Sequence, residues 1–118
     1  MIPFAILSGK IKTRTDEKEI RLLELSPDYF TFRLLKEQAQ KYEQQLSDAG
    51  QQGNIVLSFF QFQKRSYHEV ILDCTKDIVR IELMPQKQME GLVCEICVDV
   101  KNEEYRIYTE RFNKEYLN

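Results

Sequence analysis

Hydrophobic and polar residues alternate over most of this chain, and a period of two predicts β-strands. In residues 29–34, Phe30 and Phe32 would share one face, opposite Tyr29 and Arg33. Seven segments have this strand-like character: residues 2–13, 19–25, 29–34, 54–62, 67–74, 78–83 and 92–100. The pattern therefore predicts a protein built mainly from short strands.

Two further segments have a helical period. The first, residues 35–49, would dock through one apolar stripe and end at the glycines that follow it, Gly50 and Gly53. That stripe consists of Leu35, Ala39, Tyr42, Leu46 and Ala49. The second follows Asn102, a good N-cap residue with two glutamates after it, and it has a stripe of aromatic residues. That stripe consists of Tyr105, Tyr108, Phe112 and Tyr116.

The order of these segments is β-β-β-α-β-β-β-β-α, with turns expected at residues 16–18 and 26–28. Successive strands without regular helical crossovers favour an antiparallel sheet or a small barrel. A chain of 118 residues has the size of one domain, so we expect a single domain over residues 1–118. The final helix would plug one end of it.

Composition narrows the class of protein. Hydrophobic residues make up 42% and charged residues 31% of the chain, which is typical of a globular domain. The net charge of -2 gives no overall attraction to nucleic acid or to an anionic membrane. No apolar run approaches the ~20 residues that span a bilayer, and no signal peptide is recognisable. We therefore expect a cytoplasmic protein that neither inserts into a membrane nor binds nucleic acid.

Three cysteines are an odd number, which favours a reducing compartment over a disulfide framework. Cys94 and Cys97 match the CxxC spacing of zinc and redox sites, but they lie in a predicted strand. Residues three apart in a strand point to opposite faces, so the two sulfurs cannot share a metal ion. We expect neither a metal site nor a cofactor.

Catalysis finds little support in the sequence. The single histidine, His68, lies within a predicted strand, where a structural role is the more common one. The chain has no nucleophile elbow and no glycine-rich phosphate loop. We therefore expect a protein without enzymatic activity.

A basic stripe in the first hairpin is a candidate binding surface. Lys10, Lys12 and Arg14 would share one face, with Arg21 near them on the next strand. Such a stripe could hold a phosphate or a nucleotide, or it could protect an edge strand from aggregation. Three carboxylates nearby dilute its positive field: Asp16, Glu17 and Glu19.

The segment of residues 19–34 resembles the central signature of PilZ domains, an Asp/Asn-x-Ser-x-x-Gly turn between two strands. Glu24 stands at the acidic position, Ser26 at the serine and Tyr29 at the glycine. The later strands also resemble that family, and residues 102–107 lie where its last strand passes into a helix. Relative to the family core, residues 35–49 would be an insertion.

The resemblance implies a PilZ-like antiparallel β-barrel of six to seven strands, with this inserted helix and a C-terminal helix. PilZ domains bind cyclic di-GMP through that turn and through an Arg-x-x-x-Arg motif that precedes the first strand. This chain has no arginine before Arg14. Lys10 and Arg14 have the interval of the motif, but they lie within the first hairpin. The resemblance therefore implies the fold more strongly than the ligand.

We therefore expect a non-catalytic PilZ-like regulatory or interaction module that binds a protein partner, and cyclic di-GMP weakly or not at all. The alternative is a working cyclic di-GMP receptor that uses a different set of basic residues, or arginines from a second chain. The candidate ligand-binding residues are Lys10, Lys12, Arg14, Glu24, Ser26 and Tyr29. A small enzyme is the least favoured class, and the oligomeric state stays open.

Overall fold

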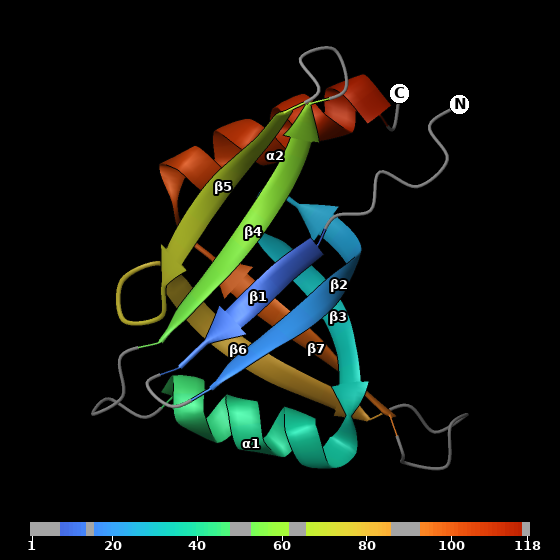
Figure 1. The fold of residues 1–118 in the computed structure, drawn as a ribbon, viewed down its shortest axis with the longest axis vertical. Coiled ribbons are helices and arrows are strands. Elements are labelled where there is room, and N and C mark those ends of the chain that lie inside the picture. Colours follow the sequence, from blue (N-terminus) through green and yellow to red (C-terminus); the bar gives the residue numbers. More distant parts are fainter. Residues whose placement is uncertain (1–7, 14–15, 48–52, 62–65, 86–92, 117–118) are drawn as a thin grey trace.

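The computed structural model describes residues 8–13, 16–47, 53–61, 66–85 and 93–116. They form seven strands and two helices (Figure 1). The elements are β1 (Ser8–Lys12), β2 (Glu17–Ser26), β3 (Tyr29–Leu35), α1 (Lys36–Ser47), β4 (Asn54–Gln61), β5 (Ser66–Asp73), β6 (Ile78–Pro85), β7 (Val93–Val100) and α2 (Glu103–Tyr116).

The strands form one antiparallel sheet in the order β5-β4-β1-β2-β3-β7-β6, and this sheet curls into a half-barrel (Figure 1). The two edge strands, β5 and β6, are consecutive in the chain, and the turn of residues 74–77 joins them. Because that turn is short, the curl brings the two ends of the sheet together at this corner. The predicted fold class is confirmed: the protein is mainly β and antiparallel, with one inserted helix and a C-terminal helix.

β2 belongs to both halves of the sheet, since its first half pairs with β1 and its second half with β3. A β-bulge between Leu22 and Glu24 separates the two stretches and leaves Leu23 48% exposed. The extra residue shifts the alternation by one position, so Ile20 before the bulge and Leu25 after it both contact the core. A bulge also bends its strand, which lets β2 turn away from β3.

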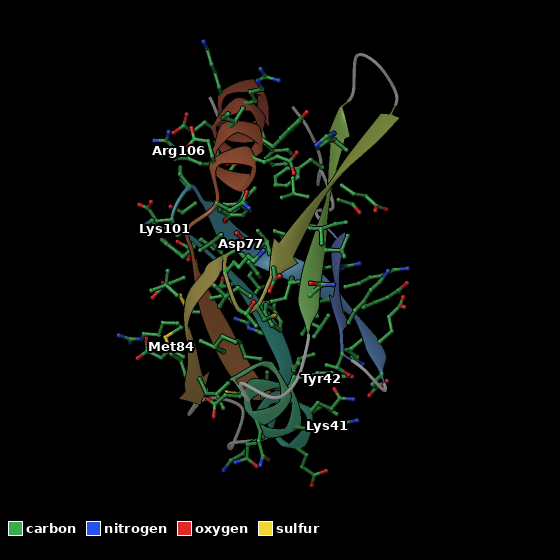
Figure 2. The ribbon with its side chains drawn as sticks, turned by 90° about the vertical axis from the view of Figure 1, so that its left-hand side faces the viewer. Lys41, Tyr42, Asp77, Met84, Lys101 and Arg106 are labelled. Carbon is green, nitrogen blue, oxygen red and sulfur yellow. The ribbon has the colours of Figure 1, made fainter. Side chains whose placement is uncertain are left out.

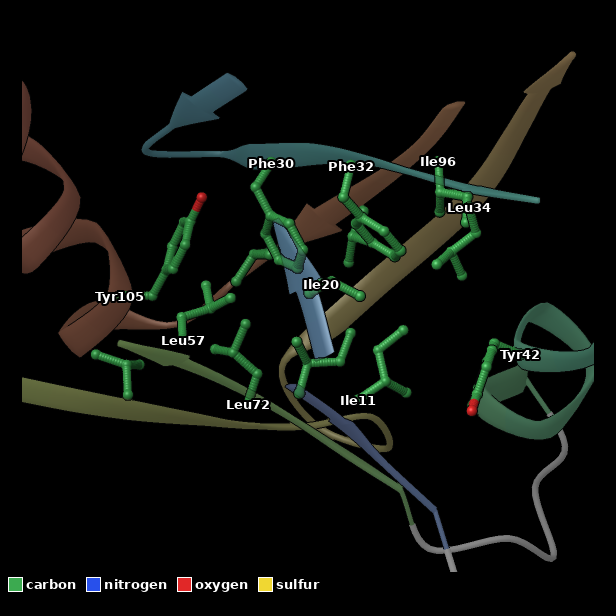
Figure 3. Close-up of a cluster of buried hydrophobic side chains, with 14 of the residues drawn as sticks. Ile11, Ile20, Phe30, Phe32, Leu34, Tyr42, Leu57, Leu72, Ile96 and Tyr105 are labelled. Carbon is green, nitrogen blue, oxygen red and sulfur yellow. The ribbon is translucent and has the colours of Figure 1, made fainter. Parts of the chain in front are cut away.

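The inner face of the half-barrel holds the hydrophobic core, shown in Figure 3. Alternate strand residues point inward, as strand geometry requires. Phe30 and Phe32 share this face, as predicted, with ring centroids 6.0 Å apart. Gly9 lies where β1 packs most closely, because a Cβ there would come within 2.9 Å of the Leu57 side chain. At Gly9 the core is therefore filled by the close approach of the β1 backbone to β4, and elsewhere by large side chains.

The two helices close opposite ends of the half-barrel (Figure 1). α1 buries Ala39 and the ring of Tyr42 against one end of the core. α2 buries Tyr105 and Phe112 at the other end, and the predicted N-cap is confirmed because the Asn102 side chain accepts the Tyr105 N–H at 2.8 Å. Neither described helix is long and apolar enough to cross a membrane.

Several predicted boundaries are corrected by the structure. The turn expected at residues 16–18 is shorter, because Glu17 and Lys18 already pair with β1. Leu35 is wrong as the first docking residue of the helix, since it ends β3, pairs with Val93 and is 56% exposed. It follows Arg33 on the outer face, opposite the buried Leu34. The side chains of Leu46 and Tyr116 lie outside the described residues, as do residues 1–7 and 49.

As predicted, the CxxC segment lies in a strand, β7, and its two cysteines point to opposite faces. Its residues alternate between buried and half-buried, so Cys94 faces the core and Cys97 faces outward. All three cysteines, Cys74 included, are free thiols. The described residues contain no group of three or more acidic, cysteine or histidine side chains that could hold a metal ion.

Candidate functional site

The β2–β3 turn carries one group of the predicted ligand-binding residues. The Tyr29 hydroxyl donates a hydrogen bond of 2.6 Å to the Glu24 carboxylate on the outer face of the sheet. That bond raises the pKa of the Tyr29 phenol. Ser26 pairs with Tyr29 at the end of the ladder. The Glu24 carboxylate, a predicted ligand-binding group, is therefore already hydrogen-bonded within the turn.

The backbone of this turn is held from inside by the first turn of α2. The buried Tyr105 hydroxyl lies 2.5 Å from the Ser26 carbonyl oxygen and 2.8 Å from the Tyr29 carbonyl oxygen. The Asn113 amide also donates to the Leu25 carbonyl at 3.3 Å. α2 therefore holds the ends of both strands, on either side of the turn.

A hollow of about 370 Å³ lies beside this turn, lined by residues 27–28, 100–103 and Arg106. Its positive charges are Lys101 and Arg106, which Figure 2 shows at the α2 end of the molecule. Two carboxylates, Asp28 and Glu103, balance them, and Arg106 donates to Glu103 at 2.7 Å. Glu24, Ser26 and Tyr29 do not line this hollow, so the predicted turn residues and the nearest cavity do not coincide.

The basic residues of the first hairpin form a second group. Lys10 and Lys12 are exposed on β1, on the face opposite the buried Ile11, as predicted. The Lys10 ammonium lies 3.2 Å from the Glu17 carboxylate, which raises the pKa of that lysine. Arg14 lies outside the described residues. Glutamate pairing therefore reduces the positive field that a phosphate would meet here.

The structure does not bring the two groups together. Lys10 pairs with Glu19, which precedes Glu24 by five positions on β2. At a rise of about 3.3 Å per residue, that separation is roughly 17 Å along the strand. The bulge at Leu23 adds a bend between the groups. The sequence-predicted set is therefore two separate surfaces on β1 and on the β2–β3 turn.

A third surface, which the sequence did not predict, lies where β2 and β3 separate. Their pairing ends at Leu22 and Phe32, and below that point in Figure 1 the two strands diverge toward α1. A hollow of about 430 Å³ occupies this space, which we call the β2–β3 notch. Its walls are residues 18–21 of β2 and 33–35 of β3, with Gln38 and Val93.

The notch leaves strand backbone without a strand partner. On β2, residues 17–21 pair with β1 on one side only, and on β3, residues 33–35 pair with β7 on one side only, within the part of the chain that the structure describes. In an antiparallel strand, alternate residues direct N–H and C=O to alternate sides. Both walls therefore present hydrogen-bonding groups to the hollow. The shift in phase from Ile20 and Leu22 to Leu25 was the sequence signal that could have revealed the bulge.

The described cysteines and the histidine lie in surroundings that do not activate them for catalysis. Burial raises the pKa of the Cys74 thiol to about 12, and it also raises the pKa of Cys94 and of Cys97. His68 stacks on Tyr108 with ring centroids 3.8 Å apart and an interplanar angle of 9°. Thiols with raised pKa values are poor nucleophiles at neutral pH because the thiolate is the reactive form.

Comparisons with family models, with curated proteins and with solved structures find no match to this chain.

Proposed function

We propose that this chain is a non-catalytic interaction module that binds an extended segment of a partner protein at the β2–β3 notch. The observation that carries the proposal is a stretch of β2 and β3 backbone that has no strand partner among the described residues, beside a hollow of about 430 Å³. An unpaired strand edge is a template for an added strand. Such binding needs only main-chain groups and pockets for alternate side chains.

The absence of catalysis is part of this proposal, and the surroundings of the reactive groups support it. The Cys74 thiol stays protonated at neutral pH because its pKa is raised to about 12. The His68 ring lies against the Tyr108 ring and the Cys97 thiol faces acidic side chains such as Asp99. The Cys97 Sγ lies 3.9 Å from Asp99 Oδ1, but the pKa of this thiol is raised, whereas a catalytic thiol has a lowered pKa.

The PilZ resemblance stays a prediction, and the separation of the candidate residues supports weak binding of cyclic di-GMP or none. Arginine forks bind phosphate and guanine edges with paired hydrogen bonds, whereas Lys10 already has Glu17 at 3.2 Å. Calorimetric titration of the chain with cyclic di-GMP tests this expectation. A dissociation constant below about 5 μM, weakened by both Lys10→Ala and Ser26→Ala, would favour the receptor alternative.

The interaction function is tested by selecting binders from an unbiased library of extended peptides. A photo-crosslinking amino acid placed at position 35, on the rim of the notch, should capture the selected peptides. Two exposed apolar positions far from the notch serve as controls: Ile71 on β5 and Val79 on β6. Equal capture at all three positions, or a selection that yields no binder, would contradict the proposed function.

A further inference from the structure

The β2–β3 notch is positively charged although the chain as a whole is not. Its lining includes three cationic side chains, Lys18, Arg21 and Arg33, against one carboxylate, Glu19. The complete chain has a net charge of -2. Charge of one sign in a hollow attracts a partner of the opposite sign. The lining therefore selects for negative charge.

The two arginines stand on opposite walls of the notch. Arg21 lies on β2 and Arg33 on β3, and both side chains are exposed. Two carboxylates lie near these arginines and reduce the positive charge of the notch. Glu19 lines the notch and also adjoins Lys10, and Glu95 is the cross-strand partner of Arg33 on β7. An arginine retains several donors when one carboxylate is near, because its guanidinium has five N–H groups.

The rest of the lining is apolar and suits an extended chain. The buried Ile20 and Leu34 lie on the inner side of the two walls, and the exposed Leu35 lies at the rim. Side chains of an extended segment alternate between two faces. One face of such a segment could therefore meet the apolar groups while the other presents carboxylates to Arg21 and Arg33.

We propose that the β2–β3 notch binds an extended acidic peptide segment, whose carboxylates pair with Arg21 and Arg33 and whose backbone pairs with the free edges of β2 and β3. This inference rests on the proposed function and names its partner class. The planar fork of arginine matches a carboxylate with two parallel hydrogen bonds. The unpaired N–H and C=O groups supply the register.

Fluorescence anisotropy with three labelled hexapeptides tests the proposal at about 150 mM salt, where exposed long-range attraction is largely screened. One peptide alternates Glu with Val, the second alternates Lys with Val, and the third is the acidic peptide with alternate backbone nitrogens methylated. The acidic peptide should bind at least about tenfold more tightly than the lysine peptide. Methylation should weaken binding at least about fivefold because it removes backbone donors and keeps the charge.

Charge reversal locates the site. The double variant Arg21→Glu with Arg33→Glu should weaken binding of the acidic peptide by about tenfold or more. The neutral pair Arg21→Gln with Arg33→Gln should give a smaller loss in the same direction. The control, Lys76→Glu with Lys101→Glu, changes the total charge equally at exposed positions away from the notch, and it should change affinity by less than about twofold. Circular dichroism establishes that each variant is folded.

Failure here is distinct from failure of the proposed function. Equal binding of the acidic and lysine peptides, no binding of the acidic peptide, or an equal loss in the control variant would overturn the acidic partner. If the library selection returns peptides without carboxylates that still crosslink at position 35, the interaction function stands and this inference is wrong.

Discussion

The two helices close opposite ends of the same half-barrel by different physical means. α2 docks through aromatic rings, with Tyr105 inside the core and its hydroxyl bonded to two backbone carbonyls. α1 docks through the Tyr42 ring, but its polar contacts are outside the core: Asp16 accepts from the Tyr42 hydroxyl at 2.9 Å and from the Lys41 ammonium at 2.7 Å. Figure 2 shows Lys41 and Tyr42 at the α1 end of the molecule.

This difference separates the two ends in their sensitivity to solvent. Buried ring contacts change little with pH or salt over the usual range, whereas an exposed ion pair weakens as salt is added and as the pH falls far enough to protonate its carboxylate. The β2–β3 notch lies beside α1, since Gln38 lines it. The end of the molecule that carries the proposed binding surface is therefore also the end whose closure depends on charge.

The largest effect should come from the α2 end. Tyr105→Ala should lower the free energy of unfolding by about 3–5 kcal/mol, because it removes a fully buried ring. Tyr105→Phe should cost about 1–2 kcal/mol, since two carbonyls lose their shared donor. The matched change at the other end, Tyr42→Phe, should cost less than Tyr105→Phe because water can reach Asp16. Urea unfolding measures the free energy of unfolding of all three variants. An equal cost for the two phenylalanine variants would contradict the difference between the buried anchor of α2 and the exposed anchor of α1.

A smaller effect is expected for the stack between α2 and β5. A double-mutant cycle with His68→Ala and Tyr108→Ala should give a coupling energy of about 0.5–1.5 kcal/mol, the range for packed ring pairs. Their parallel geometry at 3.8 Å motivates this value. His68→Ala combined with Tyr42→Ala serves as the control cycle and should be additive, since Tyr42 lies on the other helix. A coupling near zero for the stacked pair would show that ring contacts do not anchor α2.

The smallest effect should be a dependence of the α1 end on pH. Hydrogen bonds from Lys41 and Tyr42 lower the pKa of Asp16 from 3.8 to about 2. A lowered folded-state pKa means that the ionised carboxylate stabilises the fold above pH 3.8. This contribution is lost as the pH falls from about 3.8 through about 2. The difference in unfolding free energy between the wild type and Asp16→Asn should therefore shrink over that interval.

The same difference should not change between pH 5 and pH 7, where Asp16 is ionised in both states. Tyr105→Phe provides the comparison from the α2 end, because its cost should stay constant through the acidic interval. If the Asp16→Asn difference were flat down to pH 2, the ion pair would not contribute to the docking of α1.

The sequence predicted those features that depend on the local pattern or chemistry of the residues. Alternation placed Phe30 and Phe32 inward and separated Cys94 from Cys97, and helix capping by Asn102 followed from its side-chain chemistry. Leu35 was misplaced because a leucine between a strand and a helix satisfies both patterns. Its pairing with β7 is a long-range contact that no local pattern shows.

The candidate site was less predictable than the fold for a similar reason. The local sequence predicted the outward face of Lys10 and marked Glu24 through a motif, but the distance between them depends on which half of β2 pairs with which neighbour. The notch likewise exists because pairing stops at Leu22 and Phe32. A bulge adds only one residue to the alternation, and this one lies directly beside the point where the pairing of β2 with β3 ends.

The shared strand β2 also has a consequence for how the molecule unfolds. The half-sheet of β1, β4 and β5 and the half-sheet of β3, β6 and β7 each contain hairpins that are local in the chain, apart from the pairings of β1 with β4 and of β3 with β7. Neither half can unfold without exposing the buried inner face of the other to water. β2 thus couples the two halves into one cooperative unit. Its amides that are hydrogen-bonded to β1 or to β3, away from the bulge and the notch, should exchange with solvent only when the whole molecule opens.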